Sequence, residues 1–178
     1  MHVTLVQAIP KSQKMEWIIQ KATELGVREI IPVMTERGVV RLMGDKAEHR
    51  VERWQRIAEE AARQCRTAWV PRISPVVGMN RLLEEGIRGD LLLLASLEPQ
   101  AVLLRDYLRS IAGRKIHSVA LMIGPEGDFT PVESRLAKDK GAIPVSFGAS
   151  VLRVETAAVF GVGALFYEFM GTGEPPTP

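Results

Sequence analysis

The sequence predicts an α/β protein in which helices cover both faces of a mostly parallel β-sheet. Residues 91–96 (LLLLAS) and 116–123 (IHSVALMI) form largely apolar runs, without the polar alternation of a strand that has one wet face. Both faces of these strands should therefore be buried. Segments with helical spacing lie between the predicted strands, which is the order typical of parallel sheets. The hydrophobic content of 46% and the charged content of 25% are those of an ordinary globular domain.

The first part of the chain predicts two helices around one strand. A first helix is predicted from apolar residues that recur at spacings of three and four: Met15, Ile18, Ile19, Ala22 and Leu25. Gly26 follows them at the position of a C-terminal cap, so the helix should end there. Residues 27–35 (VREIIPVMT) then predict a strand. Asp45 is placed to cap a second, longer helix, whose inward face should contain Val51, Trp54, Ala58, Ala61 and Cys65.

The middle of the chain predicts a short extended piece over residues 70–77 and a helix over residues 101–112. A further helix has the clearest local signal. Thr130, Pro131 and Glu133 occupy the N-cap, first and third positions of a capping box. This helix should therefore begin at Pro131 and end before Gly141.

The end of the chain predicts a strand over residues 143–147 and a final helix from about Glu155 to Met170. That helix is apolar nearly all round, so it should be buried on all sides. We expect part of its surface to pair with a second copy of the chain in a homodimer. Gly161 and Gly163 would allow a close approach of the two helices.

Two loops follow predicted strands and lead into helices: residues 124–130 (GPEGDFT) and 148–155 (GASVLRVE). Ligands of parallel α/β sheets bind at the carboxyl ends of the strands. If the two strands are neighbours, the loops share one crevice. Gly124 and Gly127 would let the backbone approach a flat ligand such as an adenine or amino-acid group, whereas the nearby acids and the missing lysine disfavour a di- or triphosphate. The alternative is a tight turn whose acids complement the helix dipole.

The second loop places charged side chains at the start of an apolar helix. Arg153 and Glu155 stand beside Thr156 there. Charged groups at such a position are solvated, paired or functional. A salt-bridged helix start and a functional site both remain open at this level.

Charge and cysteine content exclude several classes of protein. The net charge is only +2, and with one cysteine and three scattered histidines we expect no metal site. No apolar run approaches a membrane span and no signal-peptide pattern opens the chain, so we expect a cytoplasmic protein without membrane contact.

Basic residues are concentrated between Arg37 and Arg72, where seven of them face five acids. This stretch is either a solvated helix face, stabilised by pairs such as Glu52 with Arg56 and Glu59 with Arg63, or a surface that contacts phosphates.

Several motifs resemble, in order, those of the RsmE family of SPOUT-class methyltransferases: residues 21–27 (KATELGV), Arg53-Trp54, Glu60-Ala61, Gln64 with Arg66, residues 124–127 (GPEG) and residues 152–157 (LRVETA). The resemblance covers nearly the whole chain. It implies an S-adenosylmethionine-dependent enzyme that methylates N3 of a uridine in 16S ribosomal RNA of the small subunit. It also implies a homodimer, with a C-terminal trefoil knot in a SPOUT domain over residues 1–171. Independently of the resemblance, the proline and glycine content of the tail predicts disorder over residues 172–178.

The sequence departs from the family pattern at three points. Asp128 stands where the family loop usually has a glycine, so the backbone there should be less free. Residues 149–151 (ASV) lack an arginine that family members usually carry before Leu152. Family members also begin with a PUA-type β-barrel domain, and this chain is expected to start at the catalytic domain.

The resemblance and the loops together give the expected site residues. The cofactor crevice should contain Ser96, Met122, Ile123, Gly124, Pro125, Glu126, Gly127, Phe147, Gly148, Val151, Leu152 and Ala157. Arg153 is the candidate for stabilising negative charge on the uridine, and Glu126 or Glu155 would either accept the N3 proton or orient Arg153. RNA phosphates should meet Arg37, Arg53, Arg63 and Arg66.

Two other functions are compatible with the sequence. A protein that keeps the knot and binds RNA without catalysis would fit the altered residues Asp128 and Ser150. A different nucleotide-using α/β enzyme, such as a phosphotransferase, would need a glycine-rich loop with a lysine, and the chain has none in place.

Overall fold

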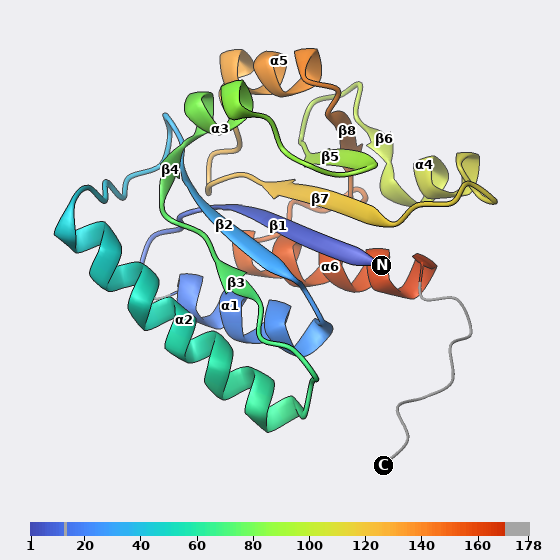
Figure 1. The fold of residues 1–178 in the computed structure, drawn as a ribbon. Helices are drawn as coiled ribbons and strands as arrows, with labels where there is room; N and C mark the ends of the chain where they lie inside the picture. The colour runs from blue at the N-terminus through green and yellow to red at the C-terminus, as the bar shows by residue number, and fades with distance from the viewer. Residues whose placement is uncertain (13, 170–178) are drawn as a thin grey trace.

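A computed structural model describes residues 1–12 and 14–169. Its strands form one sheet in the order β3-β2-β1-β7-β5-β8-β6, with β4 also paired to β2 (Figure 1). Every strand pair in the described part of the chain is parallel, which confirms the predicted sheet. The strands are β1 (His2–Ala8), β2 (Glu29–Met34), β3 (Arg72–Ile73), β4 (Val77–Gly78), β5 (Leu91–Ala95), β6 (Val102–Leu103), β7 (Ser118–Ile123) and β8 (Ile143–Ser146).

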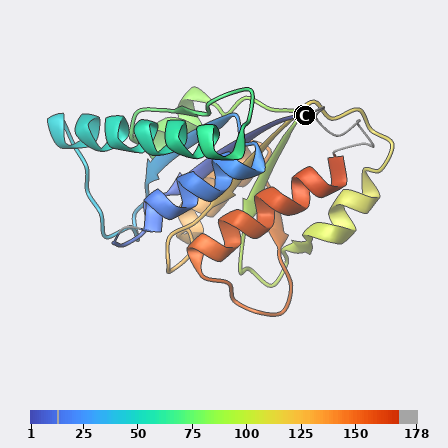
Figure 2. The same ribbon diagram turned by 90° about the horizontal axis from the view of Figure 1, so that it is seen from below.

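Helices cover both faces of this sheet, as predicted. Figure 2 shows α2, α1, α6 and α4 across one face, and Figure 1 shows α3 and α5 on the other. The helices are α1 (Lys14–Leu25), α2 (Asp45–Cys65), α3 (Met79–Glu85), α4 (Leu104–Ser110), α5 (Pro131–Asp139) and α6 (Val154–Phe169). Within the described residues, no helix has both the length and the apolar character of a membrane span.

The sheet separates two hydrophobic cores, because successive side chains of a strand point to opposite faces. Leu121 of β7 packs into the core that contains α1, α2 and α6, whereas its neighbour Met122 packs into the core beneath α3 and α5. Both side chains are completely buried. This two-sided burial is the reason that the strand sequence reads as an uninterrupted apolar run.

The central strand β1 was not predicted from the sequence, and neither was α3. β1 pairs with β2 on one side and with β7 on the other. The residues Val3, Leu5 and Val6 are fully buried and give an aliphatic signal, but Thr4 and Gln7 interrupt it. A polar residue such as Gln7 is expected at a core position only where the fold supplies a partner, so the local sequence alone argued against a central strand.

The two long helices near the N-terminus form where they were expected. Gly26 has a φ of 101°, and its N–H donates to the carbonyl oxygen of Thr23, as a C-terminal cap does. The predicted cap of α2 is wrong: Gly44 is the N-cap and makes no side-chain hydrogen bond, and Asp45 is already the first helical residue. An acidic residue there still stabilises the helix through its dipole.

The capping box of α5 is confirmed. The backbone N–H of Glu133 donates to Oγ1 of Thr130 at 3.2 Å, and the N–H of Thr130 donates to Oε2 of Glu133 at 2.9 Å. The other carboxylate oxygen of Glu133 accepts a hydrogen bond from the N–H of Glu36 at 2.8 Å. One side chain therefore caps a helix and also fastens the segment that follows β2.

Helix α6 begins at Val154, close to the predicted start. Its predicted last residue, Met170, and the predicted disordered tail over residues 172–178 lie outside the described residues. Gly161 does not face outward, as a role in helix pairing would require: a Cβ there would lie 2.7 Å from Leu121 and 2.8 Å from Phe147. Glycine at this position lets α6 approach the sheet within one subunit.

Candidate functional site

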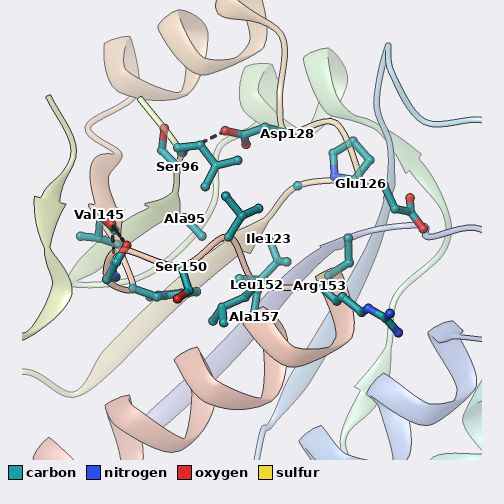
Figure 3. A pocket seen from close by; sticks show the side chains of 18 of the residues that line it. Ala95, Ser96, Ile123, Glu126, Asp128, Val145, Ser150, Leu152, Arg153 and Ala157 are labelled. Atoms are coloured by element: carbon teal, nitrogen blue, oxygen red, sulfur yellow. Dashed lines mark hydrogen bonds between the residues drawn. The ribbon is translucent and has the colours of Figure 1, made fainter. Parts of the chain in front are cut away.

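Loops at the carboxyl edge of the sheet enclose a cavity of about 310 Å³, called the crevice below (Figure 3). One wall is the loop after β7 and another is the segment between β8 and α6. The prediction of a shared crevice assumed that β7 and β8 are neighbours. They are not, because β5 lies between them. The loops nevertheless meet at one cavity, since the end of β5 contributes Ala95, Ser96 and Leu97 to its lining.

Ten of the twelve residues expected at the cofactor site line the crevice: Ser96, Ile123, Gly124, Pro125, Glu126, Phe147, Gly148, Val151, Leu152 and Ala157. Met122 and Gly127 do not. The side chain of Met122 points to the opposite face of the sheet and is buried under α3 and α5. Gly127 lines a neighbouring cavity, where a Cβ would meet only Arg37.

Nine further residues line the crevice. Arg153 was expected as a catalytic residue, and the other eight were not expected at the site: Lys14, Ala95, Leu97, Asp128, Val145, Ser146, Ser150 and Val154. Most of them flank residues that were predicted, so a wider window around each loop would have found them. Lys14 is different, because it belongs to α1. No local pattern connects it to loops more than a hundred residues away.

Asp128 closes the loop after β7. Its φ of 60° lies in the left-handed region, which is the conformation that favours glycine and agrees with the glycine expected here from the family pattern. The N–H of Phe129 donates to Oδ1 of Asp128 at 2.8 Å, and the N–H of Leu97 donates to Oδ2 at 3.0 Å. The side chain of Asp128 thus connects the loop after β7 to the segment after β5. Its two hydrogen bonds hold the residue in a conformation that glycine would adopt more easily.

The loop leaves little room for a side chain at Gly124. A Cβ at Gly124 would lie 3.1 Å from Oδ1 of Asp128 and 3.2 Å from the backbone nitrogen of Phe129. The absence of a side chain therefore serves the tight return of the chain. It also leaves the backbone open toward the crevice that Gly124 lines.

The candidate acids are paired with a lysine. Nζ of Lys14 lies 3.2 Å from Oε2 of Glu155 and 3.6 Å from Oε1 of Glu126. Burial raises the pKa of Glu155, but a hydrogen bond from its own backbone N–H and the ammonium group of Lys14 lower it by more, with a smaller contribution from Arg153. The net pKa lies below the ordinary value, so Glu155 is ionised at neutral pH.

Arg153 is exposed and forms no ion pair with either acid among the described residues. In Figure 3 the side chains of Arg153 and Glu126 extend toward the same side of the crevice, away from Val145 and Ser150. Glu126 and Arg153 therefore both line the crevice, whereas Glu155 does not line it and contacts Lys14, which does. The partner that holds both carboxylates is Lys14, although Arg153 was the expected one.

The four arginines expected to meet RNA have different surroundings. Arg37 donates hydrogen bonds from Nη1 to the carbonyl oxygens of Gly127 at 2.6 Å and Phe129 at 3.3 Å, so it braces the loop after β7. Arg53 pairs with Glu16 of α1 at 2.9 Å. Arg63 and Arg66 are exposed near the end of α2, beside a shallow hollow.

The helical pairs expected on α2 do not form within the described residues. Neither Glu52 with Arg56 nor Glu59 with Arg63 comes within ion-pair distance, and Arg53 reaches across to Glu16 instead. The contact from Arg53 to α1 is possible because the two helices pack side by side (Figure 2). In the described part of the chain, no group of three or more His, Cys, Asp or Glu side chains is placed to hold a metal ion.

A parallel sheet with an apolar crevice at its carboxyl edge and charged groups at the mouth defines an α/β domain built to bind an organic ligand. Comparison with known proteins specifies the class further. The chain belongs to the family described as the RNA methyltransferase domain, which matches residues 1–166. The resemblance to RsmE proteins is confirmed by relatives of that name.

Two curated relatives and one solved structure illustrate the similarity. Ribosomal RNA small subunit methyltransferase E of Bacillus subtilis is 34% identical over 93% of this chain and 66% of its own length. The protein of the same name from Synechocystis is 35% identical, over 87% of this chain and 50% of its own length. This chain thus spans less than two thirds of both curated relatives.

A crystal structure of ribosomal RNA small subunit methyltransferase E from Neisseria gonorrhoeae, bound to S-adenosyl methionine, superposes with a TM-score of 0.84. It is 33% identical, and the match covers 95% of this chain and 67% of that one.

Proposed function

We propose that this chain is an S-adenosylmethionine-dependent methyltransferase that acts on N3 of a uridine in 16S ribosomal RNA. The observation that carries the proposal is the crevice, since three residues of the GPEG motif (Gly124, Pro125 and Glu126) and four of the LRVETA motif line it. The latter are Leu152, Arg153, Val154 and Ala157. The similar protein from Neisseria gonorrhoeae was crystallised with S-adenosyl methionine. The names of the curated relatives give the substrate as small-subunit ribosomal RNA.

The lining of the crevice fits this cofactor. Ile123, Leu152 and Ala157 supply apolar surface for a flat ring, and the ends of three strands supply backbone donors and acceptors. Acidic side chains at the mouth suit a ligand that carries positive charge. The bound cofactor would supply an electrophilic methyl group on its sulfonium sulfur.

The residues at the mouth would prepare the uridine. N3 is a poor nucleophile while it carries a proton, so a reaction there requires a proton acceptor and a group that stabilises negative charge. In our proposal Arg153 stabilises the charge, because its side chain is exposed at the mouth. Glu126 or Glu155 would accept the proton, and both are held near Arg153 by the same lysine.

The finer architecture belongs to the same proposal. We infer a single domain over residues 1–171 with a C-terminal trefoil knot. The path of the chain supports this inference. Strand β8 lies on the far side of β5 from β7, and the chain that follows β8 crosses back so that α6 packs against β1 and β7. A cytoplasmic location would place the protein with its ribosomal substrate, and we expect it to work without a metal ion.

A homodimer is proposed on the outer faces of α6 and α1. Phe160 and Tyr167 of α6 are 48% and 87% exposed, and Trp17 of the adjacent helix α1 is 44% exposed. Large apolar side chains on two neighbouring helices are typical of a surface that is covered in an assembly. Sedimentation equilibrium should give twice the chain mass of 19.7 kDa at micromolar concentration, and a persistent monomer would contradict the dimer.

Phosphate contacts are proposed for Arg37, Arg53, Arg63 and Arg66. Their support is the excess of basic residues on and around α2, and the exposure of Arg63 and Arg66. Arg37 would act mainly through the loop that it braces.

Calorimetric titration with S-adenosylmethionine beside ATP tests the cofactor. We expect binding of the first and none of the second, and the reverse result would favour a nucleotide-using enzyme of another kind. Small ribosomal subunits that lack the modification should gain a methyl group at uridine N3, detectable by mass spectrometry of digested RNA. Binding of both cofactor and RNA without transfer would instead favour an inactive RNA-binding protein.

A further inference from the structure

Lys14 stands at an unfavourable position for a lysine. It is the first residue of α1, and the positive end of the helix dipole disfavours a cation there by a few tenths of a kcal/mol or more. A residue that opposes a local preference usually has a compensating role elsewhere in the fold. Here the compensation comes from the two carboxylates within 4 Å of its ammonium group.

The contacts of this segment connect three parts of the chain that are distant in sequence. Nζ of Lys14 reaches Glu126 in the loop after β7 and Glu155 in the first turn of α6. The backbone N–H of Lys11 also donates to Oε1 of Glu126, at 3.2 Å. Two groups from the segment before and at the start of α1 therefore hold the loop after β7 at one carboxylate oxygen, Oε1 of Glu126.

The two carboxylates would repel each other without the lysine. Both lie near one nitrogen atom, both are partly shielded from water, and only about a fifth of the Glu155 side chain is exposed. Like charges that close are destabilising unless a cation lies between them. The groups that face Glu155 are Lys14 from α1, Glu126 from the loop after β7, and Arg153 from the segment before α6.

We propose that Lys14 is a positioning residue of the crevice, whose ammonium group holds Glu126 and Glu155 together and thereby fixes the loop after β7 against the start of α6. The separation of these two walls sets the width of the crevice mouth. The inferred link between the loop after β7 and the start of α6 depends only on the two ion pairs of Lys14. Its consequence for a bound cofactor rests on the proposed function.

The first experiment needs no cofactor. Lys14→Met removes the charge and keeps the length of the side chain, and Lys14→Arg keeps the charge. Lys21→Met is the matched control, because Lys21 lies on the same helix and pairs only with Glu24 in the described contacts. We expect the carboxyl pKa of Glu155, followed by ¹³C NMR, to rise in Lys14→Met, to return toward its original value in Lys14→Arg, and to stay unchanged in Lys21→Met.

Hydrogen exchange tests the mechanical part of the proposal. Amides of residues 124–128 should exchange faster in Lys14→Met than in Lys21→Met. Adding Glu155→Gln to Lys14→Met removes one of the two repelling charges, so it should restore slow exchange. An unchanged titration of Glu155 together with unchanged exchange would overturn the proposal, and a Lys14→Met chain that folds only with Glu155→Gln would support it.

Cofactor affinity separates this proposal from the proposed function. If the wild type binds S-adenosylmethionine, Lys14→Met should bind it about tenfold more weakly, a change of about 1.4 kcal/mol, whereas Lys14→Arg should bind nearly as well as the wild type. If the wild type does not bind it, the proposed function fails, and the NMR and exchange results still decide the role of Lys14.

Discussion

The crevice and the outer face of α2 both carry charged residues, but these residues are held in different ways. At the crevice three of the charged groups contact other parts of the chain: Asp128 contacts Leu97, and Lys14 pairs with Glu126 and Glu155. Arg153 is the exposed exception. On α2 the arginines Arg50 and Arg53 pair with Glu16 of α1, whereas Arg56, Arg63 and Arg66 have no ion pair within the described residues. The first region therefore depends on where single residues lie, whereas the second depends on the sum of charge that it presents to solvent.

The two regions should respond differently to substitution. One misplaced side chain should disable a crevice whose walls are held together by specific contacts. One lost charge should weaken a basic surface only by its share of the total. The predictions below test this difference from both sides.

The largest effect is expected from filling the crevice. Ala157 lines it from the first turns of α6 (Figure 3), so Ala157→Phe should place a ring in the space proposed for the cofactor. We expect the affinity for S-adenosylmethionine to fall by roughly a hundredfold, about 2.7 kcal/mol. Calorimetry would measure the loss.

Thr156→Phe is the control for that variant, because Thr156 is exposed on the same turn and does not line the crevice. It should bind the cofactor as the wild type does. Equal affinity in Ala157→Phe and the wild type would place the site elsewhere.

A smaller effect is expected from Asp128. Asp128→Ala leaves the N–H groups of Leu97 and Phe129 without their present acceptor and keeps a Cβ at a positive φ. We expect a loss of about 1–2 kcal/mol in the free energy of unfolding by urea, with a several-fold weaker cofactor affinity.

Asp128→Gly separates the two causes of that loss. It also removes the hydrogen bonds, but it relieves the backbone at this φ, so it should be more stable than Asp128→Ala. Equal stability of the two variants would show that the backbone carries no strain at this residue.

On α2 each charge should act on its own. We expect RNA binding to weaken as salt rises, and Arg63→Ala should lower the slope of log affinity against log salt by roughly one contact. Arg53→Ala should lower it by less, because Glu16 already neutralises Arg53. Filter binding over a range of salt concentrations would give both slopes.

Arg81→Ala is a suitable control for these slopes. Arg81 lies on α3, on the opposite face of the sheet, and pairs with Glu85. A slope that falls equally in Arg81→Ala and Arg63→Ala would mean that α2 is only a solvated face.

The same contrast explains which parts of the molecule were predictable from sequence. The capping box at Thr130 and Glu133 is contained in four consecutive residues, and the buried face of α1 follows from its spacing. Signals of this kind are local, so they survive without knowledge of the fold. The crevice was located from the two loops for the same reason.

The missed features depend on contacts between distant segments. Nothing near Lys14 points to Glu126 or Glu155, and nothing near Gly161 points to Leu121. The position of β1 in the middle of the sheet is likewise set by its pairing with β2 and β7. Contacts between distant segments determine these features, and such contacts cannot be recognised from local patterns in a single sequence.

The smallest effect is expected from acid titration of Glu155. Because its pKa is lowered in the folded chain, this residue stabilises the fold above the unfolded pKa of about 4.3, and the contribution is lost as the pH falls through the folded value. The difference in melting temperature between the wild type and Glu155→Gln should therefore be constant near neutral pH. Below about pH 5 the melting temperature of the wild type should fall relative to that of Glu155→Gln. Arg63→Ala leaves the pair of Lys14 and Glu155 intact, so it should track the wild type throughout. A Glu155→Gln difference that is independent of pH would show that the partly buried carboxylate is not stabilised in the folded chain, either by Lys14 or by its backbone hydrogen bond.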